Sequence, residues 1–392
     1  MKRFYISLLS IPVALAVAAQ NPLPQTGSGE TDGFKLVWQE LFDSGSLNPE
    51  RWEIEVNGNG GGNNELQYYR EENVSVGDDG RGNGCLIITA RRENFNGKNF
   101  TSGRVISKNR TMFTHGKVEA SIRFPKTANG LWPAFWMMGN DFDEVGWPRC
   151  GETDIIEMGH QNGIRNNIQD RYFNGAMHWG QRWDQLASHA PSTANGYSLQ
   201  DDEFHLLTVI WDTDALAMYL DLDKDPGKSP YFYMTIPADE PDNAWSPGNY
   251  FHKDNFILFN LAIGGNFPGI YNADGITALN DENGQEAKMY VNYLRIYQKG
   301  TADEHLSYVS EPDEDNSGIA AVSADARFIT RDRDGLRLSR DCRLTVVTTD
   351  GTVVFDAPAR QGSFPIDSFA SGIYIARGSD ADGTVATLKF SR

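Results

Sequence analysis

Three carboxylic acids, Glu152, Asp154 and Glu157, stand within six residues of one another in the run Cys-Gly-Glu-Thr-Asp-Ile-Ile-Glu-Met. Paired carboxylic acids can cleave a glycosidic bond, because one group protonates the leaving oxygen while another attacks or stabilises the oxocarbenium-like centre. Close negative neighbours raise the pKa of one member, so that Glu157 can hold a proton while Glu152 stays ionised. These three residues are therefore the candidate catalytic groups.

This chemistry requires the three side chains to share one face of a single element. The residues between them are β-branched, which favours a strand over a helix. In a regular strand Glu152 and Asp154 point the same way and Glu157 points the opposite way. One extra residue at Ile155-Ile156, a β-bulge, would return Glu157 to the shared face. We therefore predict a bulged strand on which Glu152 and Glu157 approach the carboxyl separation of ~5–5.5 Å found in retaining glycosidases.

An acidic cluster alone more often marks a solvated strand face, so its surroundings decide what it means. Trp132, Trp136 and Trp147 lie shortly upstream. Sugar rings expose apolar C–H faces that stack on aromatic planes, so tryptophans near paired carboxylates are expected to line a saccharide-binding cleft. One or two of them could instead belong to a β-sandwich core. The aromatic context favours the catalytic interpretation.

The elements that must position these residues have the pattern of strands. Short segments rich in Val, Ile, Tyr, Phe and Trp run from about residue 36 to residue 299, separated by clusters of Gly, Asn, Asp and Pro. Several alternate apolar and polar residues with period two, as in 116–124 and 290–297, and no long stretch shows a helical period. This pattern predicts an all-β protein built on an antiparallel β-sandwich.

Composition divides the chain into five parts. The basic start, the apolar stretch from Ile6 to Ala19 and the small residues at its end are typical of a secretory signal peptide. That stretch is too short to span a bilayer and no later segment qualifies, so we expect an exported protein without a membrane span. The expected parts are a signal peptide (1–19), a linker (20–34), a catalytic domain (35–300), an acidic linker (301–318) and a small C-terminal β-sandwich domain (319–392).

The chain of 392 residues is acidic, with 35 Lys and Arg against 53 Asp and Glu and a formal net charge of −18. A charge of this sign repels the phosphates of nucleic acids and anionic lipids, and it carries no penalty for a neutral polymer such as a glucan. The three cysteines are too few for a disulfide framework and match no metal site. We expect no nucleic-acid partner, no required cofactor, and a monomer.

Several motifs between residues 36 and 299 resemble those of glycoside hydrolase family 16, laminarinase type. They are 63–69, 101–104, 131–137, 146–158, 177–179, 256–268 and 290–297. The resemblance implies a concanavalin A-like β-jelly-roll with a concave cleft. It also implies endo-hydrolysis of β-1,3- or mixed β-1,3/1,4-glucan with retention of configuration. The linkage preference stays open, because loops of unknown shape decide it.

The same resemblance assigns roles to residues. Glu152 matches the nucleophile, Asp154 the residue that tunes it, and Glu157 the general acid/base. The positions that match substrate-binding residues are Trp132, Trp136, Trp147, Arg104, His178, Asn63 and Asn64. His178 could alternatively be a buried core histidine. Members of the family often carry a structural calcium held partly by an Asp of the final strand. Here Asn292 stands in that strand, and losing a charged oxygen weakens a calcium site.

The C-terminal segment is similar to the sorting domains of the type IX secretion system, through 371–376 and the basic chain end. This similarity implies the secretion machinery as a partner and a secreted or cell-surface location. A carbohydrate-binding module is the competing interpretation, but the segment contains no Trp that could form a stacking platform.

Two rival functions use the same fold. A non-catalytic glycan-binding protein would need no acid pair, and all three carboxylates are present here. A family 16 hydrolase of agar, porphyran or carrageenan would call for basic residues around the cleft, where only Arg104 and Arg149 are evident. The sequence therefore favours a neutral glucan as the substrate.

Overall fold

The computed structural model describes residues 28–308, 329–331, 335–348, 352–366, 368–370, 373–380 and 385–391. The chain divides into two compact units, residues 1–309 and 310–392. The expected signal peptide and residues 309–318 of the expected acidic linker lie outside the described residues.

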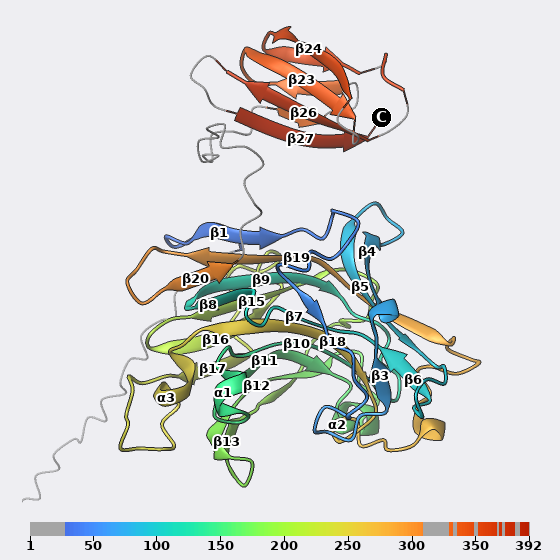
Figure 1. The fold of residues 1–392 in the computed structure, drawn as a ribbon, viewed down its shortest axis with the longest axis vertical. Helices are drawn as coiled ribbons and strands as arrows, with labels where there is room; N and C mark the ends of the chain where they lie inside the picture. The colour runs from blue at the N-terminus through green and yellow to red at the C-terminus, as the bar shows by residue number, and fades with distance from the viewer. Residues whose placement is uncertain are drawn as a thin grey trace, which may run out of the picture. The chain divides into compact units, whose positions relative to one another are not determined.

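The first unit is a sandwich of two sheets (Figure 1). One of them, the back sheet, has its strands in the order β17 (Phe232–Thr235), β16 (Ala215–Leu220), β15 (His205–Trp211), β9 (Gly116–Arg123), β19 (Glu286–Gln298), β5 (Gly84–Arg91), β6 (Phe100–Ser102) and β3 (Gln67–Tyr69). Beside β19 and β5 lie β1 (Lys35–Glu40) and β4 (Val74–Asp78). These pairings are antiparallel except that of β3 with β6.

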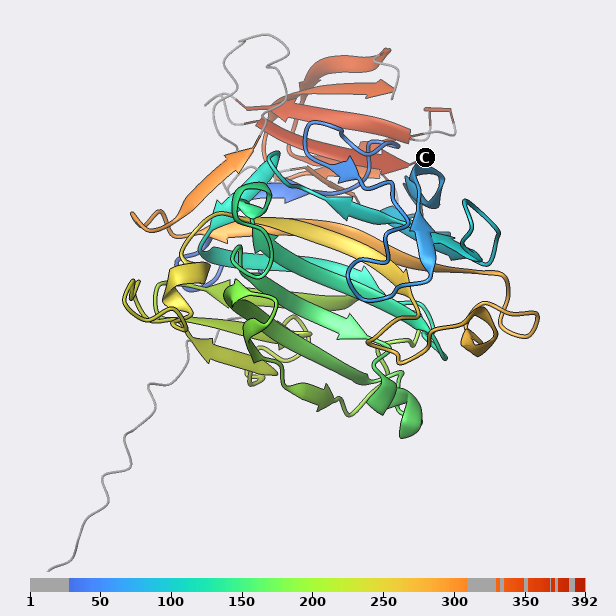
Figure 2. The same ribbon diagram turned by 60° about the horizontal axis from the view of Figure 1, so that its bottom comes forward.

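The second sheet, the front sheet, carries the candidate catalytic residues. Its order is β13 (Gln185–His189), β12 (Tyr172–Arg182), β11 (Glu152–Met158), β10 (Leu131–Gly139), β18 (Asn255–Ile263), β7 (Arg104–Ile106) and β2 (Glu53–Ile54). It also contains β14 (Ser192–Ala194) beside β12, β8 (Thr111–Thr114) beside β18, and β20 (His305–Tyr308) beside β8. Figure 2 shows β10, β11 and β12 in green running side by side, with β18 in yellow.

Helices in this unit are single turns at the ends of strands. They are η1 (Glu71–Asn73), α1 (Phe142–Val145), α2 (Gln161–Arg165), α3 (Gly248–Phe251) and η2 (Ala273–Gly275). None of the helices in the described part of the chain is long and apolar enough to cross a membrane.

The core lies between the two sheets and follows the period-two alternation. In β10, Leu131, Phe135 and Met137 are buried in the main core, and Phe135 stacks on Phe259 of β18 with ring centroids 4.8 Å apart. The intervening side chains of β10 line the cleft on the opposite face of the front sheet. The predicted all-β sandwich is confirmed, because alternating residues can bury one face of a strand and leave the other free for function.

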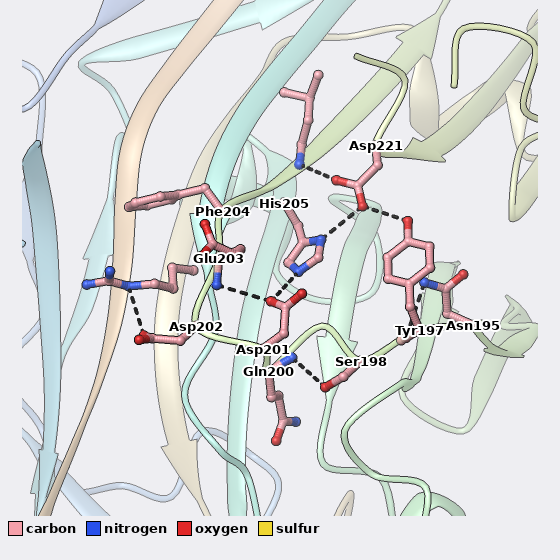
Figure 3. A network of polar contacts seen from close by, with 12 residues as sticks. Asn195, Tyr197, Ser198, Gln200, Asp201, Asp202, Glu203, Phe204, His205 and Asp221 are labelled. Carbon is pink, nitrogen blue, oxygen red and sulfur yellow. Dashed lines mark hydrogen bonds and ion pairs between the residues drawn. The ribbon is translucent and has the colours of Figure 1, made fainter. Parts of the chain in front are cut away.

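A polar network at one end of β15 joins the segment 195–203 to the back sheet (Figure 3). The carboxylate of Asp221 accepts hydrogen bonds from Tyr197 Oη at 2.6 Å and from the backbone N–H of Leu206 at 3.0 Å. His205, on β15, is buried with Nδ1 2.9 Å from Asp221 and Nε2 3.1 Å from Asp201. These bonds hold the pKa of Asp221 well below its usual range, against the opposing effect of burial.

The second unit is a small β structure with its own core. A three-stranded sheet contains β21 (Ile329–Arg331), β22 (Gly335–Leu338) and β25 (Gly362–Pro365). A four-stranded sheet contains β24 (Val353–Ala359), β23 (Cys342–Thr348), β26 (Ile373–Ser379) and β27 (Val385–Ser391). Leu336, Leu344 and Tyr374 belong to a hydrophobic cluster that contains only residues of this unit. The described residues of this unit therefore form a hydrophobic core of their own.

Candidate active site

Strand β11 contains the bulge that the catalytic interpretation requires. Against β12, Asp154 pairs with Ala176 and Glu157 pairs with Asn174, so three steps along β11 match two steps along its partner. The pairing with β10 shifts over the same stretch. Ile155 and Ile156 are both fully buried in the main core. The predicted bulge at Ile155-Ile156 is confirmed, and the three acids lie on one face of the front sheet.

Two neighbours of the bulge help to hold its shape. The hydroxyl of Tyr231 donates a hydrogen bond to the carbonyl of Ile155. Gly175, opposite the bulge, lies where a larger residue has no room for its side chain. A Cβ there would lie 2.8 Å from Met218 Sδ and 3.1 Å from the ring of Tyr231. The bulge is therefore held by the hydrogen bond from Tyr231 and by close packing around Gly175.

The acids open into a cleft of about 840 Å³ on the front sheet. Its lining includes Glu55, Asn63, Glu65, Arg104, Lys108, Trp132, Trp136, Trp147, Glu152, Asp154, Glu157, His160, Asn174, His178, Leu186, Asn260, Asn266 and Phe267. Strands β7, β18, β10, β11, β12, β13 and β14 all contribute side chains, so the cleft crosses the sheet. Such a groove suits a linear polymer.

Glu157 is held by two neutral hydrogen-bond donors. Trp132 Nε1 donates to its Oε1 at 2.9 Å, and Asn174 Nδ2 donates to its Oε2 at 2.8 Å. Burial above all, and then the charge of Asp154, raise the pKa of the Glu157 carboxyl to about 8, while both hydrogen bonds oppose the rise. Glu157 can therefore keep a proton near neutral pH, as a general acid must.

Glu152 and Asp154 share an environment with His178. His178 Nε2 lies 3.3 Å from Asp154 Oδ2, and its Nδ1 lies 2.7 Å from Ser188 Oγ, which orients the ring. Burial above all, and then the charge of Asp154, raise the pKa of Glu152 to about 8 as well, whereas His178 and a hydrogen bond from Trp147 lower it. Burial also raises the pKa of Asp154. Three crowded carboxyls cannot all ionise, so they share protons as a unit.

Glu152, Asp154 and His178 form the one group of three or more His, Cys, Asp and Glu side chains in the described residues that could hold a metal ion, and two of them are candidate catalytic acids. Asn292 stands in the strand where the resemblance places a calcium-binding Asp, and its Nδ2 donates to the carbonyl of Gly84 at 2.8 Å. This amide engages the Gly84 carbonyl through its N–H group and offers a calcium ion a neutral oxygen in place of a carboxylate, which makes a weaker site.

The three predicted tryptophans all line the cleft, with different exposure. Trp132 is 8% exposed, and Phe267 stacks on it at 4.7 Å with an interplanar angle of 12°. Trp136 donates from Nε1 to Asn260 at 2.7 Å, and the guanidinium of Arg104 lies 5.3 Å from its ring centroid. Trp147 is 39% exposed. Trp147 is therefore the most accessible stacking surface of the three.

Of the predicted polar residues, Arg104, His178 and Asn63 line the cleft and Asn64 does not. Asn64 adopts a left-handed conformation with φ of 58°, and its Nδ2 donates to Asn266 Oδ1 at 2.9 Å. Its side chain therefore contacts the cleft-lining Asn266 without lining the cleft itself. His178 stands in the cleft, so its alternative interpretation as a core histidine is wrong.

Asn174, Glu65 and Phe267 were missed as site residues. Asn174 precedes His178 by four residues on one strand, so period two places both on the same face, and this signal was available. Glu65 accepts from Gln67 Nε2 at 2.5 Å and from Tyr69 Oη at 3.0 Å. These partners lie two and four residues along the same segment, so period two was an available signal for them, whereas the stacking of Phe267 on Trp132 joins distant parts of the sequence and has no local signal.

The chain is similar to several known proteins. The profile of the beta-glucan synthesis-associated protein family SKN1/KRE6/Sbg1 matches residues 52–148. The chain is 35% identical to the clotting factor G alpha subunit of Tachypleus tridentatus, over 71% of this chain and 36% of that protein's length. It is 31% identical to the beta-glucanase of Rhodothermus marinus, over 69% of this chain and 87% of that protein. A GH16 structure from the mixed-linkage glucan PUL of Bacteroides ovatus, in complex with a G4G4G3G product, is 36% identical. The alignment covers 67% of this chain and 100% of the chain in that structure, with a TM-score of 0.58.

Proposed function

Because the chain belongs to glycoside hydrolase family 16, we propose that it cleaves neutral β-1,3- or mixed β-1,3/1,4-glucans internally, with retention of configuration. Its relatives and structural neighbours make it a glycoside hydrolase of the laminarinase type. The observation that carries the proposal is the bulge of β11, which brings Glu152, Asp154 and Glu157 to one face of a cleft that crosses the sheet.

The proposed reaction has two steps. Glu152 attacks the anomeric carbon and forms a glycosyl ester, while the bond to the leaving oxygen breaks and Glu157 gives that oxygen its proton. Glu157, now ionised, then removes a proton from a water molecule that attacks the same carbon and releases Glu152. Asp154, next to His178, adjusts the charge around the nucleophile. After the first step Glu157 is ionised, as a base must be, and after the second step it is protonated again and can act as an acid.

A neutral substrate is supported by how the cations in the cleft are paired. Arg104 lies 3.5 Å from Glu55 and 3.8 Å from Glu65. Lys108 lies 2.7 Å from Asp143. A sulfated polysaccharide would need cations free to bind its sulfate groups, and these two are already engaged by carboxylates. An uncharged glucan needs hydroxyl partners and aromatic surfaces, which the lining supplies.

We also propose that the protein is exported and that the C-terminal unit serves in sorting. The apolar stretch after the basic start supports export, and the small β unit with its separate core supports a module that acts on its own. Deleting residues 310–392 should leave the protein inside the producing cell, which fractionation and immunoblotting would detect. Unchanged export of the shortened protein would contradict the sorting role.

The proposed activity is tested with laminarin, barley β-glucan and lichenan, side by side with κ-carrageenan and porphyran. Wild-type protein should release reducing ends from the neutral glucans, and Glu152→Gln should lose nearly all of that release. Binding of laminarin without reducing-end release by the wild type would point to a glycan-binding protein instead. Faster cleavage of a sulfated polymer would overturn the substrate assignment.

A further inference from the structure

Asn174 is the one partner of Glu157 that belongs to neither the predicted acids nor the predicted aromatic residues. It lies on β12 directly opposite Glu157 and is 6% exposed. Its Nδ2 donates to Glu157 Oε2 at 2.8 Å, while Trp132 holds the other carboxyl oxygen. Both oxygens of the carboxyl are thus fixed, from two different strands.

The direction of these bonds matters for proton transfer. An indole N–H can only donate, and the amide of Asn174 is turned so that its N–H group faces Glu157. Neither partner can therefore accept the proton of the Glu157 acid. The proton must lie on a lone pair that the two donors leave free, where a bound sugar can take it. If the amide were reversed, its oxygen would accept that proton and compete with the leaving group.

The other end of the same amide is unsatisfied. The Oδ1 of Asn174 is buried and has no hydrogen-bond partner in the described part of the protein. Asn174 also lines the cleft. A buried acceptor without a partner costs free energy until a donor reaches it.

We propose that Asn174 is a positioning residue for the acid/base, holding Glu157 so that its proton is delivered to the glycosidic oxygen. This inference rests on the proposed function. Asn174 itself forms and breaks no covalent bond. Its effect should therefore be large when the leaving group needs a proton and small when it does not.

Leaving-group dependence supplies the test. The full-length variants Asn174→Ala and Asn174→Asp are compared with wild type on barley β-glucan and on a 2,4-dinitrophenyl β-glycoside of a glucan disaccharide. Misplaced catalytic groups cost up to about 100-fold in rate, so kcat/KM on β-glucan should fall about 10- to 100-fold. On the aryl glycoside kcat/KM should stay within about twofold, since dinitrophenolate departs without protonation.

The pH profile gives a second readout. Asn174→Asp places another carboxyl against Glu157, and a like charge raises the pKa of its neighbour. The basic limb of kcat/KM on β-glucan should therefore move to higher pH. Asn94→Asp is the matched control, because it adds the same charge at an exposed residue outside the cleft lining. It should match wild type on both substrates.

The outcomes distinguish a failure of the role of Asn174 from a failure of the proposed function. An equal fall on both substrates, or no fall on either, would overturn the role of Asn174. The ratio between the two substrates is taken within one preparation, so partial misfolding does not affect it. Glu157→Gln is the reference, and it should lose about 10²- to 10⁴-fold on β-glucan and little on the aryl glycoside. If Glu157→Gln shows no such difference, the proposed function fails rather than this inference alone.

Discussion

At the scale of single residues, opposing effects set the state of Glu157. Burial and the charge of Asp154 favour its neutral form, and hydrogen bonds from Trp132 and Asn174 favour the ionised form. A general acid works best when its pKa lies near the operating pH, and the same group must ionise to act as a base in the second step. The opposing effects on its pKa therefore suit Glu157 to act as an acid in the first step and as a base in the second.

The first prediction concerns pH dependence. Glu157 must be protonated to act as an acid, and its pKa is raised to about 8. Activity should therefore persist through neutral pH and fall as the pH rises through about 8. The measurement is kcat/KM on barley β-glucan between pH 5 and pH 10. A profile that already falls between pH 5 and pH 6 would mean that Glu157 is not held neutral.

Residues could be predicted from the sequence where type and spacing carry the chemistry. Glu152, Asp154 and Glu157 were accessible because a two-residue period and one bulge are local properties. The pairing of Glu65 with Arg104 was not accessible, because Arg104 lies on a distant strand and meets Glu65 only in the folded protein. Asn64 was assigned to the cleft, together with Asn63, from the family resemblance, and its left-handed backbone places it outside the cleft lining.

At the scale of elements, the bulge of β11 is the decisive feature. Without an extra residue, Glu157 would face the core and one isoleucine would face the cleft. Burial of both Ile155 and Ile156 opposes that slip, and the hydroxyl of Tyr231 bonds the carbonyl of Ile155. Packing and hydrogen bonding therefore favour the same register.

Tyr231→Phe is the second prediction. It removes the hydroxyl and leaves the Ile155 carbonyl without this donor, which should lower the free energy of unfolding by about 1–3 kcal/mol. Activity should fall as well, because the bulge positions Glu157. Urea unfolding and glucan hydrolysis are the measurements. Tyr233→Phe is a suitable control, since Tyr233 is exposed. Unchanged stability and activity in Tyr231→Phe would contradict the role of this bond.

The network around Asp221 gives the third prediction. Its carboxylate accepts bonds from Tyr197, His205 and the backbone of Leu206, so Asp221→Asn should cost about 3–5 kcal/mol at neutral pH. Because the pKa of Asp221 is lowered in the folded protein, its contribution is present above the unfolded pKa of about 3.9 and is lost as the pH falls. The difference between variant and wild type should therefore shrink in acid. A difference that grows below pH 4 would refute this reasoning.

At the scale of the whole molecule, two units with separate cores share one chain. The two-sheet sandwich was predictable because each strand carries its own period-two pattern. The strand order was not, since β9 pairs with β15 and β19 from distant parts of the sequence and local patterns do not encode such partners. Short strands of the second unit were recognisable for the same local reason.

The fourth prediction follows from the separate cores. A protein that lacks residues 310–392 should hydrolyse barley β-glucan with kcat/KM within about twofold of the full chain, since the cleft is built from the first unit alone. Thermal unfolding of the shortened protein should remain cooperative. A loss of activity of tenfold or more would mean that the first unit depends on the second.

The central claim is that one bulged strand presents three carboxyls that act by a retaining mechanism. Proton NMR during the first minutes of glucan hydrolysis tests it most directly, because it identifies the anomer that forms before mutarotation. A retaining enzyme should release the β-anomer first, through the glycosyl ester on Glu152. Initial release of the α-anomer would require a single displacement by water and would contradict the roles given to Glu152 and Glu157.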